Sequence, residues 1–109
     1  MLRQSLDPGS PYAFSLVSAG KGQAFQRRTM AGVASTNTPG PFVTAPQWVR
    51  LTRAGNIVTA LTSSDGIFWT VVDSDVLDFT GPVYAGLAVS SHDASVSARA
   101  VFTHVRIVP

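Results

Sequence analysis

Apolar and polar side chains alternate along most of this chain with a period of two, the pattern of β-strands that bury one face. In the segment 12–17, for example, Tyr12, Phe14 and Leu16 fall on one face. Similar patterns predict further strands over 23–30, 48–53, 57–62, 68–72, 83–89 and 95–108. Glycine-containing turns separate several of these segments, and no helical period of useful length is present.

Two parts of the chain depart from simple alternation. The loop 31–46 is rich in Gly, Pro, Ser, Thr and Asn, with room for a short edge strand. In the last strand the apolar positions change from even to odd numbers, which predicts a β-bulge near Thr103 and His104. We therefore predict about seven or eight strands in one all-β domain over residues 1–109, a two-sheet antiparallel β-sandwich of jelly-roll type.

Composition favours strands over helices and argues against nucleic-acid binding. Glutamate is absent and Lys21 is the only lysine, although both residue types are favoured on helix surfaces. The formal net charge is only +2, and no basic run offers the several cations that phosphate neutralisation needs. Nucleic acid is therefore not an expected partner.

The chain carries no sequence signal for a cellular compartment. It contains no cysteine, so no disulfide is expected and the redox environment stays open. Residues 1–14 include Pro8 and Pro11 and no apolar stretch typical of a signal peptide. No apolar run approaches the roughly 20 residues of a membrane helix, so a membrane is not an expected partner either.

Five segments, taken in order, carry a family resemblance: 5–13, 25–28, 48–53, 63–69 and 83–92. Together they resemble a concanavalin A-like, laminin-G-like β-sandwich module found in bacterial secreted and multidomain proteins. The resemblance implies the fold but little about function, because such modules share no uniform activity. It also implies earlier strands that this chain lacks, so that 1–4 and 12–17 would form open apolar edges. We therefore expect a homodimer or higher homo-oligomer that buries more than roughly 1,000 Å².

No arrangement of residues suited to catalysis is recognisable. Glycosidases of concanavalin-like fold use paired carboxylates, whereas this chain has no glutamate and its aspartates fall in turns and connections. Ser91, His92 and Asp93 are adjacent in a turn, so their side chains would not meet as a triad requires. His104, near the expected bulge, is interpreted as a partly buried structural residue. The sequence therefore predicts a protein that is not an enzyme.

Calcium is the metal that the aspartates suggest. Asp73, Ser74, Asp75 and Asp78 offer oxygen atoms, but Ca²⁺ takes roughly six to eight ligands and the spacing matches no EF-hand. Asp is also an ordinary residue of turns between strands, so the turn interpretation is favoured and no cofactor is predicted.

The segment 63–69 resembles an Asp-box hairpin, although it is one residue shorter between the aspartate and the tryptophan. In such a turn the Asp65 carboxylate accepts backbone N–H groups and Trp69 packs beneath. We therefore predict a structural role for Asp65.

Strand alternation also predicts a candidate binding face. If Phe25, Val49, Leu51, Leu87 and Val89 face the core, the neighbouring positions point outward. The outward set combines aromatic rings, guanidinium groups and an amide, which suits a sugar, and consists of Gln26, Arg28, Trp48, Arg50 and Tyr84, with the small residues Gly86 and Ala88. The sequence thus favours a non-catalytic binding or accessory module with a glycan as the first ligand class to test. The alternative is a structural or interaction domain that self-associates and has no small ligand.

The same alternation predicts which side chains form the core. We expect deep burial at Phe14, Leu16, Val49, Leu51, Leu87, Val89 and Phe102.

Overall fold

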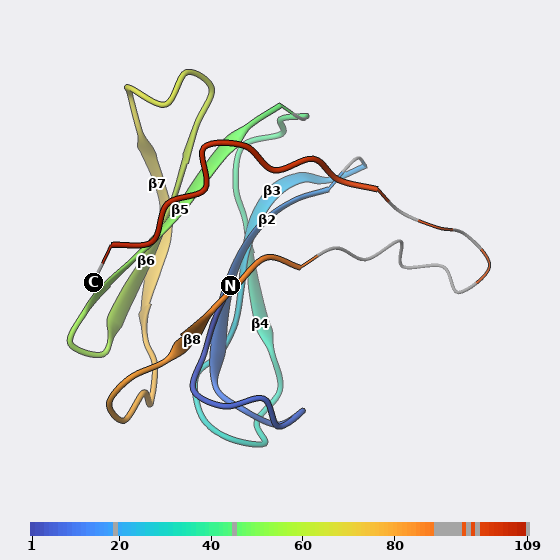
Figure 1. Cartoon of the computed structure of the whole chain (residues 1–109). Helices are drawn as coiled ribbons and strands as arrows, with labels where there is room; N and C mark the ends of the chain where they lie inside the picture. Colours follow the sequence, from blue (N-terminus) through green and yellow to red (C-terminus); the bar gives the residue numbers. More distant parts are fainter. Residues whose placement is uncertain (19, 45, 89–94, 96, 98, 109) are drawn as a thin grey trace.

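The structure is a computed structural model of the chain, and it describes residues 1–18, 20–44, 46–88, 95, 97 and 99–108. Within these residues the chain is all-β: eight strands form two antiparallel sheets, and no helix is present (Figure 1). Consequently, no helix long and apolar enough to cross a membrane occurs in the described part of the chain.

The five-stranded sheet has the order β4-β3-β2-β1-β8. Its strands are β1 (Leu2–Arg3), β2 (Tyr12–Ser18), β3 (Gly22–Arg28), β4 (Thr36–Pro39) and β8 (Tyr84–Ala85). The hairpin of β2 and β3 closes at Gly22, which has φ 76°. A Cβ at Gly22 would lie 2.8 Å from the carbonyl oxygen of Pro41, so only glycine fits where the loop after β4 crosses this turn.

The three-stranded sheet has the order β5-β6-β7. Its strands are β5 (Trp48–Ala54), β6 (Ile57–Ser63) and β7 (Thr70–Val76). The register of β6 and β7 shifts between Ala60, which lies opposite Asp73, and Leu61, which lies opposite Val71. Val72 is therefore an extra residue in β7, and it packs against the core rather than pointing outward.

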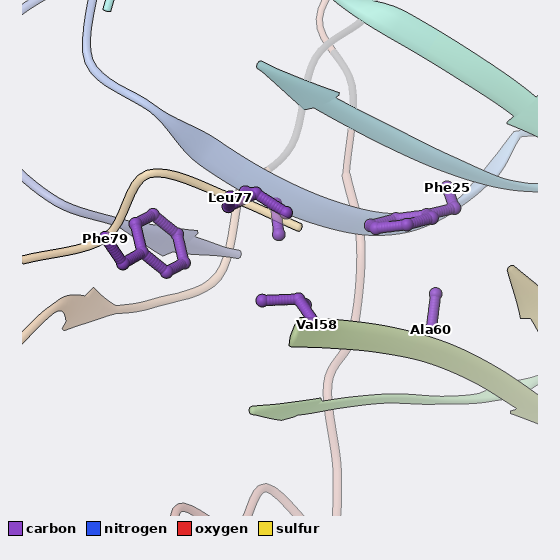
Figure 2. Packing of buried hydrophobic residues seen from close by; sticks show 6 residues of the cluster. Phe25, Val58, Ala60, Leu77 and Phe79 are labelled. Carbon is purple, nitrogen blue, oxygen red and sulfur yellow. The ribbon is translucent and has the colours of Figure 1, made fainter. Parts of the chain in front are cut away.

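The two sheets pack against each other through their inner faces, where the apolar core lies. Its buried members come from β2, β3, β6 and the segment after β7, and they are Ala13, Phe25, Val58, Ala60, Leu77 and Phe79. Figure 2 shows the last five between the two sheets. Burying one large apolar side chain of this kind stabilises the fold by about 1.5–3 kcal/mol. Backbone bonds from Leu77 to Asn56 and from Asp78 to Thr29 tie the segment after β7 to both sheets.

The predicted orientation of β2 is wrong. Phe14 lies opposite Gln26 in the β2–β3 register, whereas Phe25 lies opposite Ser15. Because residues paired across antiparallel strands share a face, Phe14 and Leu16 cannot face the core together with Phe25. Phe25 occupies the inner face beside small residues, and Phe14 and Leu16 are half-buried on the outer face.

The remaining core predictions have mixed outcomes. Leu51 faces inward and packs against the core, as its predicted register requires, but it is half-buried rather than deeply buried. Val49, in an edge strand, is 42% exposed, and Leu87 and Phe102 are 58% and 46% exposed, so their predicted deep burial is wrong. Leu87 follows the two-residue β8, and Phe102 belongs to a segment without strand pairing. Val89 lies outside the described residues.

The predicted strand and bulge at the C-terminal end are also wrong for the residues described there. Residues 99–108 contain no strand, and Figure 1 shows them as an irregular trace passing beside β5. The backbone of His104 nevertheless departs from extended geometry, with φ 55°. Because no described strand contains His104, this left-handed conformation is not the predicted bulge.

The predicted open edges are not edges in the structure. Leu2 and Arg3 pair with β2 on one side and with β8 on the other, and the hairpin of β2 and β3 lies within the same sheet. The edge strands are instead β4 and β8 in the larger sheet and β5 and β7 in the smaller one.

Candidate functional site

Four aromatic and cationic side chains form a row across the outer face of the larger sheet. Tyr84 is the register partner of Arg3, which pairs with Tyr12, and Tyr12 pairs in turn with Arg28. The guanidinium carbons of Arg3 and Arg28 lie 5.4 and 5.3 Å from the centre of the Tyr12 ring. We call these four residues the tyrosine row.

The two arginines of the tyrosine row are engaged with the backbone. Arg3 donates hydrogen bonds to the carbonyls of Ser5 and Asp7, at 3.1 and 2.7 Å. Arg28 donates at 2.8–3.3 Å to three carbonyls, those of Val33, Pro8 and Ser10. These bonds fix the turn before β2 and the loop after β3, so both arginines have structural roles.

The remaining side chains of this face offer modest room for a ligand. Tyr84 is 57% exposed, and Gln26 lies on the same face, half-buried and opposite Phe14. A pocket of about 200 Å³ beside the row is lined mainly by Met1, Arg3, Leu6, Tyr84 and Leu87. Its volume is below the roughly 300–1,000 Å³ of typical small-molecule sites.

A second group of rings lies on the outer face of the smaller sheet. Trp48 and Trp69 meet edge to face with their ring centres 6.5 Å apart. The guanidinium carbon of Arg50 lies 3.9 Å from the centre of the Trp69 ring, and the His104 ring lies 5.3 Å from that of Trp48. We call Trp48, Arg50, Trp69 and His104 the indole site.

The turn 63–69 supports one side of the indole site. The Asp65 Oδ1 atom accepts the backbone N–H groups of Ile67 and Phe68, at 2.8 and 3.0 Å. These two bonds, followed by one donated by the Ser63 hydroxyl, hold the pKa of Asp65 below its usual range. The predicted capping by Asp65 is therefore confirmed.

The indole beneath this turn differs from the prediction. A Cβ at Gly66, whose φ is 76°, would lie 2.8 Å from a ring carbon of Trp48. Trp48 in β5, rather than Trp69, therefore packs against the turn. Trp69 instead joins the site through Arg50 and the edge of Trp48. The predicted role of Trp69 was confined to the hairpin, and Trp69 was not among the predicted binding residues.

Arg50 is unlike the other arginines of strands β1 to β5. Arg3, Arg27, Arg28 and Arg53 all donate hydrogen bonds to carbonyl or carboxylate oxygens. In the described part of the chain, Arg50 forms a cation–π contact with Trp69 and neither a hydrogen bond nor an ion pair. No described residue therefore accepts a hydrogen bond from its N–H groups.

The predicted binding residues do not share one face. Gln26, Arg28 and Tyr84 lie on the larger sheet, and Trp48 and Arg50 lie on the smaller one. Each is outward-facing on its own sheet, but the sheets meet through their inner faces, so the two groups lie on opposite sides of the molecule. Alternation within a strand determines the face of a residue and not the sheet to which its strand belongs.

The calcium candidates have other partners in the structure. Asp73 and Asp75 face inward from β7 and form ion pairs with Arg27 of β3, at 3.5 and 2.9 Å. A hydrogen bond from the Ser74 N–H, then one from the Thr38 hydroxyl, then the charge of Arg27 lower the pKa of Asp73. The described residues contain no cluster of three or more His, Cys, Asp or Glu that could hold a metal.

Two further expectations concern candidate catalytic residues. Ser91, His92 and Asp93 lie outside the described residues. His104 is exposed, contrary to the prediction of partial burial, and its ring contacts the Trp48 ring at a tilt of 39°. Comparisons of the chain with protein-family models, curated proteins and solved structures found no match.

Proposed function

We propose that this chain is a non-catalytic binding module, of the concanavalin A-like β-sandwich type, that binds glycans through the indole site. The observation that carries the proposal is the availability of Arg50. Its guanidinium lies on the half-buried Trp69 indole, beside the more exposed Trp48, and has no hydrogen-bonding partner among the described residues. Aromatic rings offer apolar surface to the C–H groups of a sugar, while guanidinium N–H groups donate to its oxygens.

Glycans fit this surface better than a compact apolar ligand does. Trp48 is 37% exposed, and the residues around it form an open surface at the end of the sheet. An extended polar ligand can follow such a surface without a deep pocket.

A glycan array with neutral and acidic saccharides tests the proposal. We expect saturable binding that is lost in Arg50→Ala and retained in Tyr84→Ala, because the tyrosine row lies on the other sheet. The matched control Thr52→Ala changes the same face of β5 and should bind normally. Binding lost in Tyr84→Ala but kept in Arg50→Ala would move the site to the tyrosine row, and no binding at all would contradict the function.

Self-association is the second candidate function, and a separate observation favours it. Ile57, Val71 and Val76 are 51–63% exposed on the outer face of the smaller sheet. A second copy of this chain that covered them would bury apolar surface. Light scattering at micromolar concentration tests this idea: a dimer that becomes a monomer in Val71→Asp supports it, and a monomeric parent chain contradicts it.

A further inference from the structure

On the outer face of the smaller sheet, the strand residues around Arg50 carry no negative charge. Leu61 lies opposite Arg50 in the β5–β6 register, and Val71 follows in β7. The Trp69 ring covers one side of the guanidinium. The described residues therefore supply no counter-ion to this cation.

The aspartates of the smaller sheet and its turn are directed elsewhere. Asp73 and Asp75 face inward to Arg27, on the opposite side of the sheet. One oxygen of Asp65 is occupied by the N–H groups of its own turn. Among the described residues Arg50 therefore has no acidic partner, and an anionic ligand would supply the opposite charge that its own sheet face lacks.

The contact with Trp69 also restricts the guanidinium. A carbon 3.9 Å from the ring centre is in direct contact with the indole face, as in stacking of two planar groups. Stacking leaves the edges of the guanidinium free, where pairs of parallel N–H groups can meet both oxygens of a carboxylate. Such charge-assisted bonds are about twice as strong as those between neutral groups.

We infer that the indole site selects acidic saccharides, with the carboxylate of a uronic acid paired to the edge of Arg50 and the sugar ring against the indoles. The inference rests on the proposed glycan function and specifies its ligand class. It goes beyond that function because a neutral glycan would need only the indole surface and single hydrogen bonds. Acidic peptides and polyanions are the competing ligands that the test must separate.

A matched pair of ligands tests the inference by calorimetry: a galacturonic acid oligosaccharide and its methyl ester, which has the same skeleton without the charge. We expect the acid to bind at least about tenfold more tightly than the ester. Arg50→Gln, which keeps an N–H donor but removes the charge, should reduce the acid to the affinity of the ester. Arg50→Lys should fall between them because it keeps the charge but loses the planar fork. The Thr52→Ala variant should keep the full preference.

The outcomes separate this inference from the proposed function. Equal affinity for acid and ester, with both lost in Arg50→Gln, overturns the acidic preference and leaves glycan binding intact. No binding to any array glycan overturns both. Dextran sulfate or an acidic peptide that binds while the uronic acid oligosaccharide does not, or polyanion binding unchanged in Arg50→Gln, also overturns the acidic-saccharide inference.

Discussion

The two outer faces of this molecule use the same pair of residue types in different ways. On the larger sheet, Arg3 and Arg28 lie on either side of Tyr12 in the register and direct their N–H groups into backbone carbonyls. On the smaller sheet, Arg50 lies on Trp69 and bonds to no described residue. An arginine next to an aromatic ring therefore does not identify a binding site by itself. The partners of its five N–H groups distinguish a structural arginine from an available one.

The largest effect in this comparison is expected for Arg28→Ala. The variant removes donors from the carbonyls of Val33, Pro8 and Ser10, so we expect about 2–3 kcal/mol lower free energy of unfolding. Urea denaturation measures the change, and glycan binding should be unaffected in the folded variant. A loss below about 0.5 kcal/mol would show that these bonds do not hold the turn.

Tyr12→Phe isolates the hydroxyl of the tyrosine row. The Tyr12 hydroxyl and the Ser35 hydroxyl are 2.7 Å apart, whereas the ring contacts with both arginines do not need it. We expect about 1 kcal/mol lower stability by the same denaturation assay. Tyr84→Phe is the matched control, since the Tyr84 hydroxyl has no recorded partner among the described residues. A larger loss of stability in Tyr84→Phe than in Tyr12→Phe would contradict the structural role given to the Tyr12 hydroxyl.

Arg50→Ala should change stability least among the arginine variants. An exposed stacking contact of this kind contributes about 0.5–1 kcal/mol, so the melting temperature should fall by only a few degrees while ligand binding is lost. Calorimetric scans of the free protein measure the first quantity. Destabilisation as large as that of Arg28→Ala would make Arg50 a structural residue and remove the contrast between the faces.

The smallest expected effect is that of acid on the stability of the turn 63–69, which packs against Trp48. Because hydrogen bonds from Ile67 and Phe68 lower the pKa of folded Asp65, its contribution is present above the ordinary Asp pKa. The contribution is lost as pH falls through the lower, folded value. Asp65→Ala should therefore lower the melting temperature at neutral pH and show a shallower decline in acid, with Asp78→Ala as the control. Parallel acid profiles of parent and Asp65→Ala proteins would contradict this origin.

The sequence predicted several local elements because alternation and turns are local properties, although the predicted strand 83–89 is only Tyr84–Ala85 and the described residues of 95–108 form no strand. Residues 12–17, 48–53 and 57–62 are strands in the structure within one residue at each end, and the loop 31–46 contains the short edge strand β4. The Asp65 turn was predicted for the same reason, since its hydrogen bonds join residues close in the chain. Strand formation and turn capping need only short-range information.

The assignment of strands to sheets could not be predicted in the same way. Gln26 and Trp48 both alternate outward, yet their strands belong to different sheets, and nothing in their own segments records that difference. Phe14 was assigned to the wrong face because the β2–β3 register decides which side of β2 shares a face with Phe25. Alternation within either strand alone does not contain that register. Arg27 shows the same limit: it follows the inward parity of Phe25, and only the opposite sheet supplies the aspartates that make its burial tolerable.

The extra residue Val72 reverses the phase of β7, and the two halves of the strand consequently serve different sides of the sheet. Before it, Trp69 and Val71 belong to the outer side, where Arg50 lies. After it, residues of the same odd parity, Asp73 and Asp75, reach inward to Arg27. Deleting Val72 would make the alternation of β7 continuous. Either Trp69 would then lose its contact with Arg50, or Asp73 and Asp75 would lose their ion pairs with Arg27. Substitutions can therefore retune the ligand surface independently of the interior, whereas a change of length in β7 alters both at once.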